Sequence, residues 1–398
     1  MNVAYILNNT TATNGDTKAF LNLLQGVIGR GIHPFVIMPD KNGIYHELER
    51  NSKVRIKTFN YRTCAYPRLR TAIDRLYFVP KLLARIIVNW KASRQLATYL
   101  KENAIDIVHT NVGVVRIGFN AAQRNGIPHI YHIREYRSEF GIHYFPAKTS
   151  FLHQLDDNKS YSICITKAIQ RYYQQAGKRK QSRVIYDGVF SKRDDMPESQ
   201  EKNYFLFAGR IQPAKGLDQL LMAYKLYSDK EAHPLCLKIA GSIVDENYSK
   251  KQTKFVEEHR LSGTVEFMGN RDDIADLMRK ARALVVASPL EGFGFCMPEA
   301  QQQGCLVIAR NTGGTKEQLD NALDIAGQEI ALRYESTEQL AGLLSEVANH
   351  PLAFYGKYIQ KAFTVVNQLY TTENHVDKVC EFYHDILSDK NHSPVAIE

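Results

Sequence analysis

Short apolar runs alternate with amphipathic stretches along most of the chain. In the first half, seven runs rich in β-branched and aromatic residues predict strands, at residues 3–8, 35–39, 54–59, 105–110, 127–133, 161–166 and 183–187. Helical periodicity lies between several of them, and in residues 18–29 it places Phe20, Leu23, Leu24 and Val27 on one face. Because strands alternating with helices form right-handed βαβ units, this half is predicted to contain a parallel sheet.

A polar segment interrupts this pattern at residues 191–203, which lack apolar periodicity and include a proline. We interpret it as a linker. Beyond it the alternation resumes, with strands predicted at 204–208, 236–240, 265–268, 284–287 and 306–309 and mostly helix from about residue 336. The pattern therefore predicts a Rossmann-like domain at 1–190, a second at 204–370, and a final helix at 371–398 that crosses back toward the first domain.

Composition narrows the class of protein. Hydrophobic residues make up 44% and charged residues 23% of the 398 residues, which is typical of a globular protein. No apolar stretch is long enough to cross a membrane, and the N-terminus enters a strand pattern without a signal-peptide character, so a cytoplasmic protein is expected. The six cysteines include no Cys-x-x-Cys pair and are interpreted as buried, reduced thiols.

The segment 205–216 joins a buried strand to a helix through a loop that carries Arg210 and Lys215. Ligands of open α/β sheets bind beyond the carboxyl ends of the strands, and a helix N-terminus favours anions there. Two cations at such a place suit a diphosphate. Taken alone, the segment is equally compatible with two solvated surface charges.

A second strand–loop–helix segment spans residues 287–300. Gly292 and Gly294 allow backbone N–H groups to turn toward a ligand, and carboxylates such as Glu291 and Glu299 accept hydrogen bonds from the vicinal hydroxyls of a hexose or a ribose. Glu299 can also be read as an ordinary acid in the first turn of a helix.

The order of these motifs resembles the retaining glycosyltransferases of family four, also described as glycosyl transferases group 1. The matching elements are Gly-Arg-x4-Lys-Gly from Gly209, Glu-Gly-Phe-Gly-x4-Glu-Ala from Glu291, then Gly304, and Gly-Gly-x2-Glu from Gly313. The resemblance covers about 110 residues, from Gly209 to Glu317. It implies an α/β protein of the GT-B fold, in which two Rossmann-like domains with parallel sheets face each other across a cleft.

The resemblance also implies roles for individual residues. Arg210 and Lys215 would bind the donor diphosphate and assist its departure, Glu291 would contact sugar hydroxyls, and Glu299 would hold the ribose. Further donor contacts would come from Gly209, Gly294, Phe295 and Cys296, which belong to the same two strand–loop–helix segments. The donor would be a nucleoside-diphosphate sugar of the UDP or GDP type, and no metal would be needed because the two cations take its place.

The first half departs from the family pattern at two places expected near the acceptor. The loop after the first strand has a single glycine, in Asn14-Gly15, where the family often has two. Where the family often has His-Asp, this chain has Arg134-Glu135, with His132 two residues earlier. Asn14, Gly15, His132 and Arg134 are therefore candidate acceptor or cleft residues, and His132 can equally be a core residue.

Residues 62–101 interleave basic and apolar side chains. Such a stretch is typical of a helix that contacts an anionic membrane surface, and equally of a domain helix with a solvated basic face. The net charge of +9 permits either, and no nucleic-acid-binding module is recognisable.

The leading hypothesis is a retaining glycosyltransferase of cell-surface polysaccharide or glycolipid synthesis, cytoplasmic or peripheral on the inner face of the membrane, with a glycan or lipid-linked acceptor. Alternatives are a sugar synthase of the same fold with a soluble acceptor, or a nucleotide-sugar-binding protein without turnover. An oxidoreductase is disfavoured because no Gly-x-Gly-x-x-Gly follows the first strand.

Overall fold

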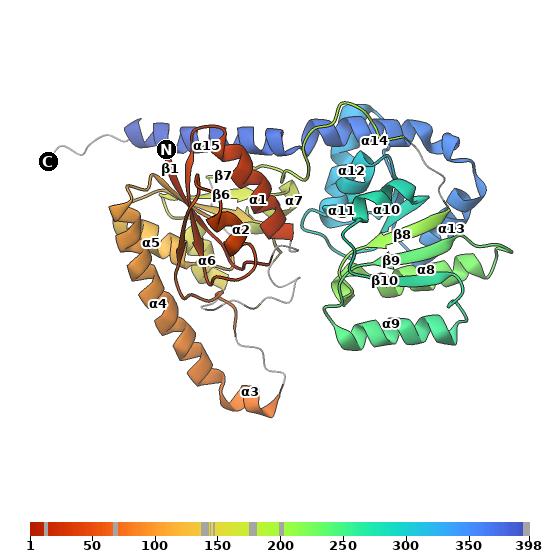
Figure 1. The fold of residues 1–398 in the computed structure, drawn as a ribbon, viewed down its shortest axis with the longest axis horizontal. Coiled ribbons are helices and arrows are strands. Elements are labelled where there is room, and N and C mark those ends of the chain that lie inside the picture. Colours follow the sequence, from red (N-terminus) through yellow and green to blue (C-terminus); the bar gives the residue numbers. More distant parts are fainter. Residues whose placement is uncertain are drawn as a thin grey trace. The chain divides into compact units, whose positions relative to one another are not determined.

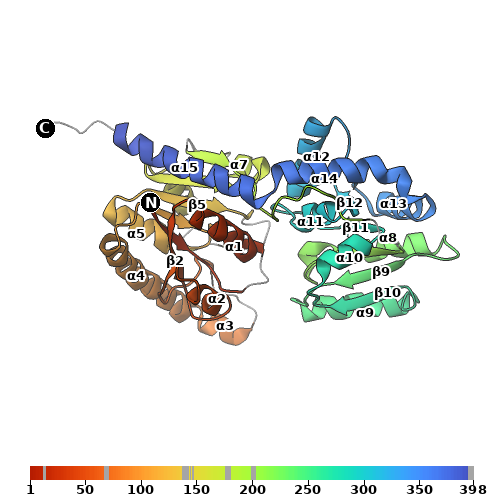
Figure 2. The same ribbon diagram turned by 45° about the horizontal axis from the view of Figure 1, so that its top comes forward.

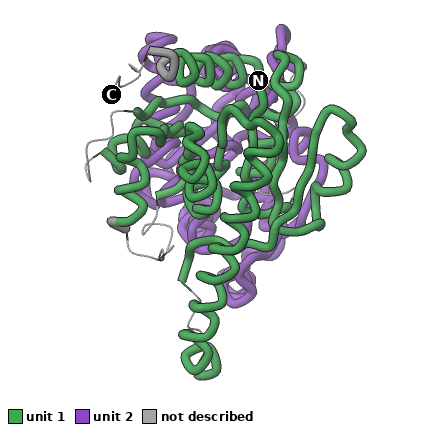
Figure 3. The backbone as a smooth tube through the Cα atoms, turned by 90° about the vertical axis from the view of Figure 1, so that its left-hand side faces the viewer, with its two compact units in different colours: residues 1–188, 372–398 green, residues 189–371 purple. Residues whose placement is uncertain are grey.

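The computed structural model describes residues 1–11, 15–66, 71–136, 143, 145, 148–174, 181–198 and 203–392 (Figure 1). The chain divides into two compact units (Figure 3). Unit 1 comprises residues 1–188 and 372–398, and unit 2 comprises residues 189–371. Each is an α/β unit with its own sheet and core, as the alternating pattern predicted.

Unit 1 contains a parallel sheet of seven strands in the order β3-β2-β1-β4-β5-β6-β7. The strands are β1 (Asn2–Ile6), β2 (His33–Met38), β3 (Arg55–Thr58), β4 (Ile107–Thr110), β5 (His129–Ile133), β6 (Ser160–Cys164) and β7 (Ser182–Val184). All seven predicted strands are present. The order reverses between β1 and β4, so the loops after these two strands leave the sheet at a topological switch point.

Helices cover both faces of this sheet (Figures 1 and 2). They are α1 (Gly15–Ile28), α2 (Tyr45–Glu49), α3 (Ala72–Leu76), α4 (Phe78–Glu102), α5 (Ile117–Asn125), α6 (Lys148–Leu155), α7 (Lys167–Gln174) and α15 (Thr372–His392). The four apolar residues expected on one face of α1 are all buried. There α1 meets α15 closely: a Cβ on Gly26 would lie 2.4 Å from a methyl group of Val376. The last helix of the chain is thus part of the core of unit 1.

The buried residues of α4 all lie in its second half, whereas its first half contacts the segment 62–66 through Phe78, Arg85 and Asn89. The buried residues are Ala92, Ser93, Leu96, Ala97 and Leu100. The first half, together with α3, extends away from the sheet (Figure 1). Apolar side chains on this projecting part are exposed: Ile73, Leu76, Tyr77, Val79, Leu83, Ile86, Ile87 and Trp90.

Unit 2 contains a parallel sheet of six strands in the order β10-β9-β8-β11-β12-β13. The strands are β8 (Tyr204–Ala208), β9 (Cys236–Ala240), β10 (Val265–Gly269), β11 (Ala283–Val286), β12 (Leu306–Arg310) and β13 (Leu332–Tyr334). The helices are η2 (Pro213–Lys215, a 3-10 turn), α8 (Leu217–Ser228), α9 (Glu246–Glu258), α10 (Ile274–Lys280), α11 (Cys296–Gln302), α12 (Gly313–Ala326), α13 (Thr337–Asn349), η3 (Leu352–Tyr355, a 3-10 turn) and α14 (Gly356–Leu369).

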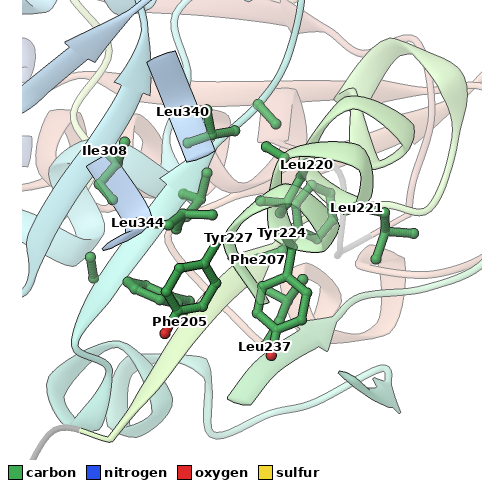
Figure 4. Close-up of a cluster of buried hydrophobic side chains, with 14 of the residues drawn as sticks. Phe205, Phe207, Leu220, Leu221, Tyr224, Tyr227, Leu237, Ile308, Leu340 and Leu344 are labelled. Carbon is green, nitrogen blue, oxygen red and sulfur yellow. The ribbon is translucent and has the colours of Figure 1, made fainter. Parts of the chain in front are cut away.

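The core of unit 2 lies on both faces of its sheet. On one face, Phe205 and Phe207 of β8 pack with Leu220 and Tyr224 of α8 and Leu344 of α13 (Figure 4). On the other face, residues of α10, α11, α12 and α14 pack against alternate residues of the same strands. The central strands are therefore buried on both faces, which explains why their sequences are continuous apolar runs.

Three details differ from the sequence-based picture. Strand β13 was not predicted, because it has only three residues and Arg333 lies in the middle of it. All six cysteines are free thiols, but Cys236 is exposed rather than buried. The described start of the polar segment 191–203 lies on unit 2, where the carbonyl of Ser191 accepts a hydrogen bond from Gln302 and the backbone N–H of Arg193 donates to Asn367.

Candidate functional site

The candidate donor site begins where β8 ends. The N–H of Gly209 donates to the carbonyl of Ala240 at 3.0 Å, which continues the ladder between β8 and β9 for one residue. Arg210 follows as an exposed side chain. Within the described parts of the chain it has no hydrogen-bond or ion-pair partner. The structure thus presents an unpaired guanidinium at the carboxyl edge of the sheet.

Lys215 is held in the same loop by a glycine. It ends the 3-10 turn η2, and Gly216 then adopts a left-handed φ of 66°. A Cβ at Gly216 would lie 2.1 Å from the carbonyl oxygen of Ala287, at the end of the neighbouring strand β11. Only glycine allows this approach, and it brings the loops after β8 and β11 together.

This approach places Lys215 on Glu291. The Nζ atom of Lys215 lies 2.5 Å from Oε1 of Glu291, with the two side chains 24% and 11% exposed. Ser288 donates a hydrogen bond to the same carboxylate oxygen at 2.6 Å. The sequence predicted both residues as site residues but not their contact, because 76 positions separate them.

The loop that carries Glu291 rests on the start of α12. The N–H of Gly314 donates to the carbonyl of Glu291 at 2.9 Å, and the side chain of Gln318 donates to the carbonyl of Phe293 at 2.6 Å. A Cβ at Gly314 would lie 2.5 Å from the carbonyl oxygen of Gly292. The Gly313-Gly314 pair of the motif therefore provides space for the loop that holds Glu291.

Gly294, Phe295, Cys296 and Glu299 lie where this loop enters α11. Gly294 adopts φ 95°, Phe295 precedes the helix, and Cys296 and Glu299 occupy its first turn. Glu299 is partly exposed and belongs to the helix ladder through its N–H, which donates to Phe295. Desolvation, with a further contribution from Glu291, raises the pKa of the Cys296 thiol to about 12. Cys296 is therefore neutral near pH 7 and is no nucleophile.

In unit 1, Arg134 and His132 belong to a buried charge network. Arg134 donates to both carboxylate oxygens of Asp187, at 2.9 and 2.8 Å, and also to the side-chain oxygen of Asn111 at 2.9 Å. The Nε2 atom of His132 lies 3.4 Å from Oδ1 of Asp187, and its Nδ1 lies 3.2 Å from Nε2 of His109. His132 and Asp187 are fully buried.

Burial and charge determine how this network ionises. Burial opposes the charge on Asp187, but Arg134 and His132 outweigh it and hold the pKa of this carboxyl well below its usual range. Desolvation and the Arg134 charge lower the pKa of His132 to about 3, so this imidazole is neutral near pH 7. The structure thus shows His132 and Arg134 as interior residues near the carboxyl end of β5. Their contact with an acceptor stays a prediction.

The other acceptor candidates lie after β1. Gly15 is the first residue of α1, and Asn14 lies outside the described residues. Asn9 accepts a hydrogen bond from Thr17 and donates one to Asp16, and the side chain of Asn111 donates to the carbonyl of Asp16. Asn111 and Asp187 were not predicted as site residues. Asn111 directly follows one predicted strand and Asp187 ends another, and functional side chains of α/β sheets are found at such positions.

The described residues contain no group of three His, Cys, Asp or Glu side chains arranged to hold a metal ion. They also contain no helix with the length and apolar character required to cross a bilayer.

Comparisons with known proteins agree with this picture. Residues 190–362 match the family model described as glycosyl transferases group 1. An uncharacterized glycosyltransferase of Methanocaldococcus jannaschii is 26% identical over 309 residues, which cover 73% of this chain and 81% of that protein. The D-inositol 3-phosphate glycosyltransferase of Streptomyces avermitilis is 31% identical over 135 residues, which cover 32% of this chain and 29% of that enzyme.

The fold also has close structural counterparts. The structure of HepE from Anabaena in complex with UDP has a TM-score of 0.75 at 15% identity, covering 97% of this chain and 100% of that one. At this identity the likeness establishes the fold alone. The chain therefore has the GT-B fold, and its residues 190–362 match the glycosyl transferases group 1 model. These findings support glycosyltransferase activity.

The packing of the Glu291 loop on α12 is tested by Gly314→Ala. We expect this variant to lose about 1–3 kcal/mol of unfolding free energy, because the new methyl group overlaps backbone oxygens that cannot move independently. Gly342→Ala is the matched control, since Gly342 is helical and exposed and its new Cβ has nothing within 4 Å. The control should be unchanged or gain about 0.5–1 kcal/mol. Urea unfolding followed by circular dichroism measures both, and equal stabilities would contradict the role assigned to Gly314.

Proposed function

We propose that the protein is a retaining glycosyltransferase that moves a sugar from a nucleoside-diphosphate sugar of the UDP or GDP type to an acceptor in cell-surface polysaccharide or glycolipid synthesis. The observation that carries this proposal is the contact between Lys215 and Glu291 next to the unpaired Arg210. All three lie after neighbouring strands, β8 and β11, within the group 1 domain.

The two cations have different tasks in this proposal. Arg210 is exposed and has no partner among the described residues, so its planar fork of donors is available to a diphosphate. Lys215 is held by Glu291 before any donor binds, which fixes the position of its ammonium group. Preorganised cations stabilise the negative charge that develops on the departing nucleoside diphosphate, and they do so without reorganisation during the reaction.

Glu291 provides the polar contact for the transferred sugar. Lys215 and Ser288 both bind its Oε1 atom, which leaves Oε2 without a donor among the described residues and available to accept hydrogen bonds from sugar hydroxyls. Glu299, one helical turn into α11, is proposed to hold the ribose hydroxyls, and the backbone at Gly209, Gly294, Phe295 and Cys296 to border the donor. The retaining outcome and the family-four assignment rest on the order of the motifs.

The acceptor is proposed to be lipid-linked, with the protein peripheral on the cytoplasmic face of a membrane. The supporting observation is the projecting part of α3 and α4. Val79, Leu83 and Ile87 are each more than half exposed, although a soluble domain helix would bury such residues. Basic residues accompany them, and between Arg75 and Lys101 the chain contains no acidic residue.

The donor site is tested by Arg210→Ala and Lys215→Ala. Each variant should lower turnover at least tenfold, and on the order of 10²-fold, because each removes one preorganised charge from the leaving group. Release of nucleoside diphosphate, measured over a panel of UDP- and GDP-sugars, gives the rates. Proton NMR of the product of the unchanged enzyme should show the anomeric configuration of the donor.

Lys357→Ala is the matched control for charge, because Lys357 is an exposed cation at the start of α14 and not in the loops after β8 and β11. It should have the turnover of the unchanged enzyme. Near-normal turnover in both site variants would refute the donor site, and an inverted product would refute retention. Donor binding without turnover on any acceptor would instead favour the non-catalytic alternative.

The role of the two cations also predicts the response to metal removal. Activity should persist in excess EDTA, because Arg210 and Lys215 supply the positive charge at the diphosphate. The measurement is turnover with and without chelator, followed by addition of magnesium or manganese. Loss of activity that either ion restores would show that the side chains do not replace a metal.

The membrane hypothesis is tested by vesicle sedimentation. Binding to anionic vesicles should be clear at low salt and weak at high salt, because each basic residue near an anionic surface contributes about 1 kcal/mol that salt screens. The double variant Arg75→Glu with Arg85→Glu should bind less. If the protein ignores anionic vesicles at every ionic strength, a soluble acceptor becomes the better proposal.

A further inference from the structure

A cavity of about 490 Å³ lies in unit 1 between α4, α5 and α6, and its lining includes neither Asn9 nor Asp16. Its volume is within the range of about 300–1,000 Å³ typical of ligand pockets. One wall comes from the exposed part of α4, through Ile86, Asn89 and Trp90. The facing wall comes from α5, through Ile117 and Phe119. Part of its lining is therefore apolar and open to the exposed face of α4.

The charged residues in the described lining of this cavity are all basic. Arg85, Arg116 and Arg124 line it, and the described residues of its lining include no aspartate or glutamate. Arg116 is only 4% exposed, and its Nη1 donates to Ser150 at 3.3 Å. Arg85 is fixed by a hydrogen bond of 2.6 Å to the carbonyl of Ala65. A buried cation beside apolar walls favours a ligand that combines an anionic group with a hydrocarbon part.

Ser93 independently indicates that the cavity takes a polar ligand atom. This residue is 3% exposed and lines the cavity. Its hydroxyl has no hydrogen-bond partner among the residues that the structure describes. Because a buried hydroxyl without a partner costs free energy, a ligand oxygen at this place would stabilise the site.

The apolar wall continues onto the surface of α4. Val79, Leu83, Ile86 and Trp90 follow one another at steps of three or four residues, and with Ile87 they form a single exposed stripe. Ile86 and Trp90 belong both to this stripe and to the cavity lining. A hydrocarbon chain can therefore leave the cavity along α4 without passing through water.

The charges on α3 and α4 disfavour a second copy of the chain as the occupant. A two-fold contact would place this helix pair against its own copy, and with it Arg75, Arg85, Lys91 and Arg94; Lys81 is paired with Asp74. Like charges brought together in this way repel. An anionic amphiphile, in contrast, complements both the arginines and the stripe.

We propose that the cavity between α4 and α5 binds a single-chain alkyl or isoprenoid phosphate, with the phosphate at Arg85 and Arg116 and the chain along Ile86 and Trp90. This inference rests on the proposed function, for which it names the acceptor lipid and its site. The lipid phosphate would bind to α4 and α5 of unit 1, and this binding does not require a nucleotide-sugar donor.

Trp90 reports on this site directly, because it is the only tryptophan of the chain and is 48% exposed. Dodecyl phosphate, added below its micelle concentration, should shift the emission of Trp90 to the blue and saturate at one molecule per chain. Inorganic phosphate and the neutral dodecyl maltoside should cause no saturable shift. Arg85→Gln and Arg116→Gln should each weaken binding at least tenfold, on the scale of one lost charge-assisted hydrogen bond.

Lys101→Gln is the matched control, because Lys101 is an exposed cation on the same helix but outside the cavity. It should bind like the unchanged protein. Arg116 is buried, so the folding of its variant is checked by circular dichroism, and the partly exposed Arg85 provides the test if that variant does not fold. Lys215→Ala should also bind dodecyl phosphate normally, which separates this site from the donor site.

Several outcomes would overturn the proposal. One is the absence of a shift, and another is equal binding of the neutral detergent. A shift that grows without saturation would assign the stripe to the bilayer surface in general. Sedimentation of the unchanged protein as a dimer that Leu83→Glu dissociates would make the stripe a subunit interface. In each case, turnover of nucleotide sugars by the same preparation would show that the proposed transferase function still stands.

Discussion

The candidate donor site depends on backbone segments that approach each other more closely than any side chain would allow. Gly216 lets the loop after β8 reach the carbonyl of Ala287, and Gly313 and Gly314 let the loop after β11 rest on α12. These contacts fix both ends of the Lys215–Glu291 pair from the backbone rather than from flexible side chains. Surface ion pairs usually contribute little to stability because two long side chains must lose conformational freedom. Here the backbone contacts already restrict the positions of both residues.

In unit 1, a buried ion pair organises the region at the carboxyl ends of the strands. The fully buried carboxylate of Asp187 is compatible with folding only because Arg134 binds it through two hydrogen bonds. Removing either partner of such a pair leaves an uncompensated buried charge, which costs about 3–5 kcal/mol. The network extends from His132 through His109 to Tyr383 on α15. The last helix of the chain thus contributes a polar contact to the interior of unit 1 in addition to its apolar face.

Much of the architecture could be predicted because burial on both faces of a sheet leaves a local signal. Seven strands of unit 1 and five of the six in unit 2 appear as short apolar runs, whereas β13 is too short and too polar to stand out. The motif order likewise predicted Arg210, Lys215 and Glu291 as donor-site residues, and the structure brings Lys215 and Glu291 into contact. The contact of Lys215 with Glu291 and that of Arg134 with Asp187 could not be predicted, because partners 76 and 53 positions apart leave no periodic pattern.

The stretch 62–101 shows most clearly where sequence reasoning ends. An apolar residue at helical spacing has the same pattern whether it packs into a core or remains on the surface, so both interpretations were open. The structure separates them along one helix: Leu96 and Leu100 are buried, while Leu83 and Ile87 are exposed. The six basic residues from Arg75 to Lys101, without an acid between them, compare with a net charge of +9 for the whole chain. Most of the charge excess is therefore concentrated on the segment that carries the exposed apolar stripe, and a general preference for solubility would have dispersed it over the surface.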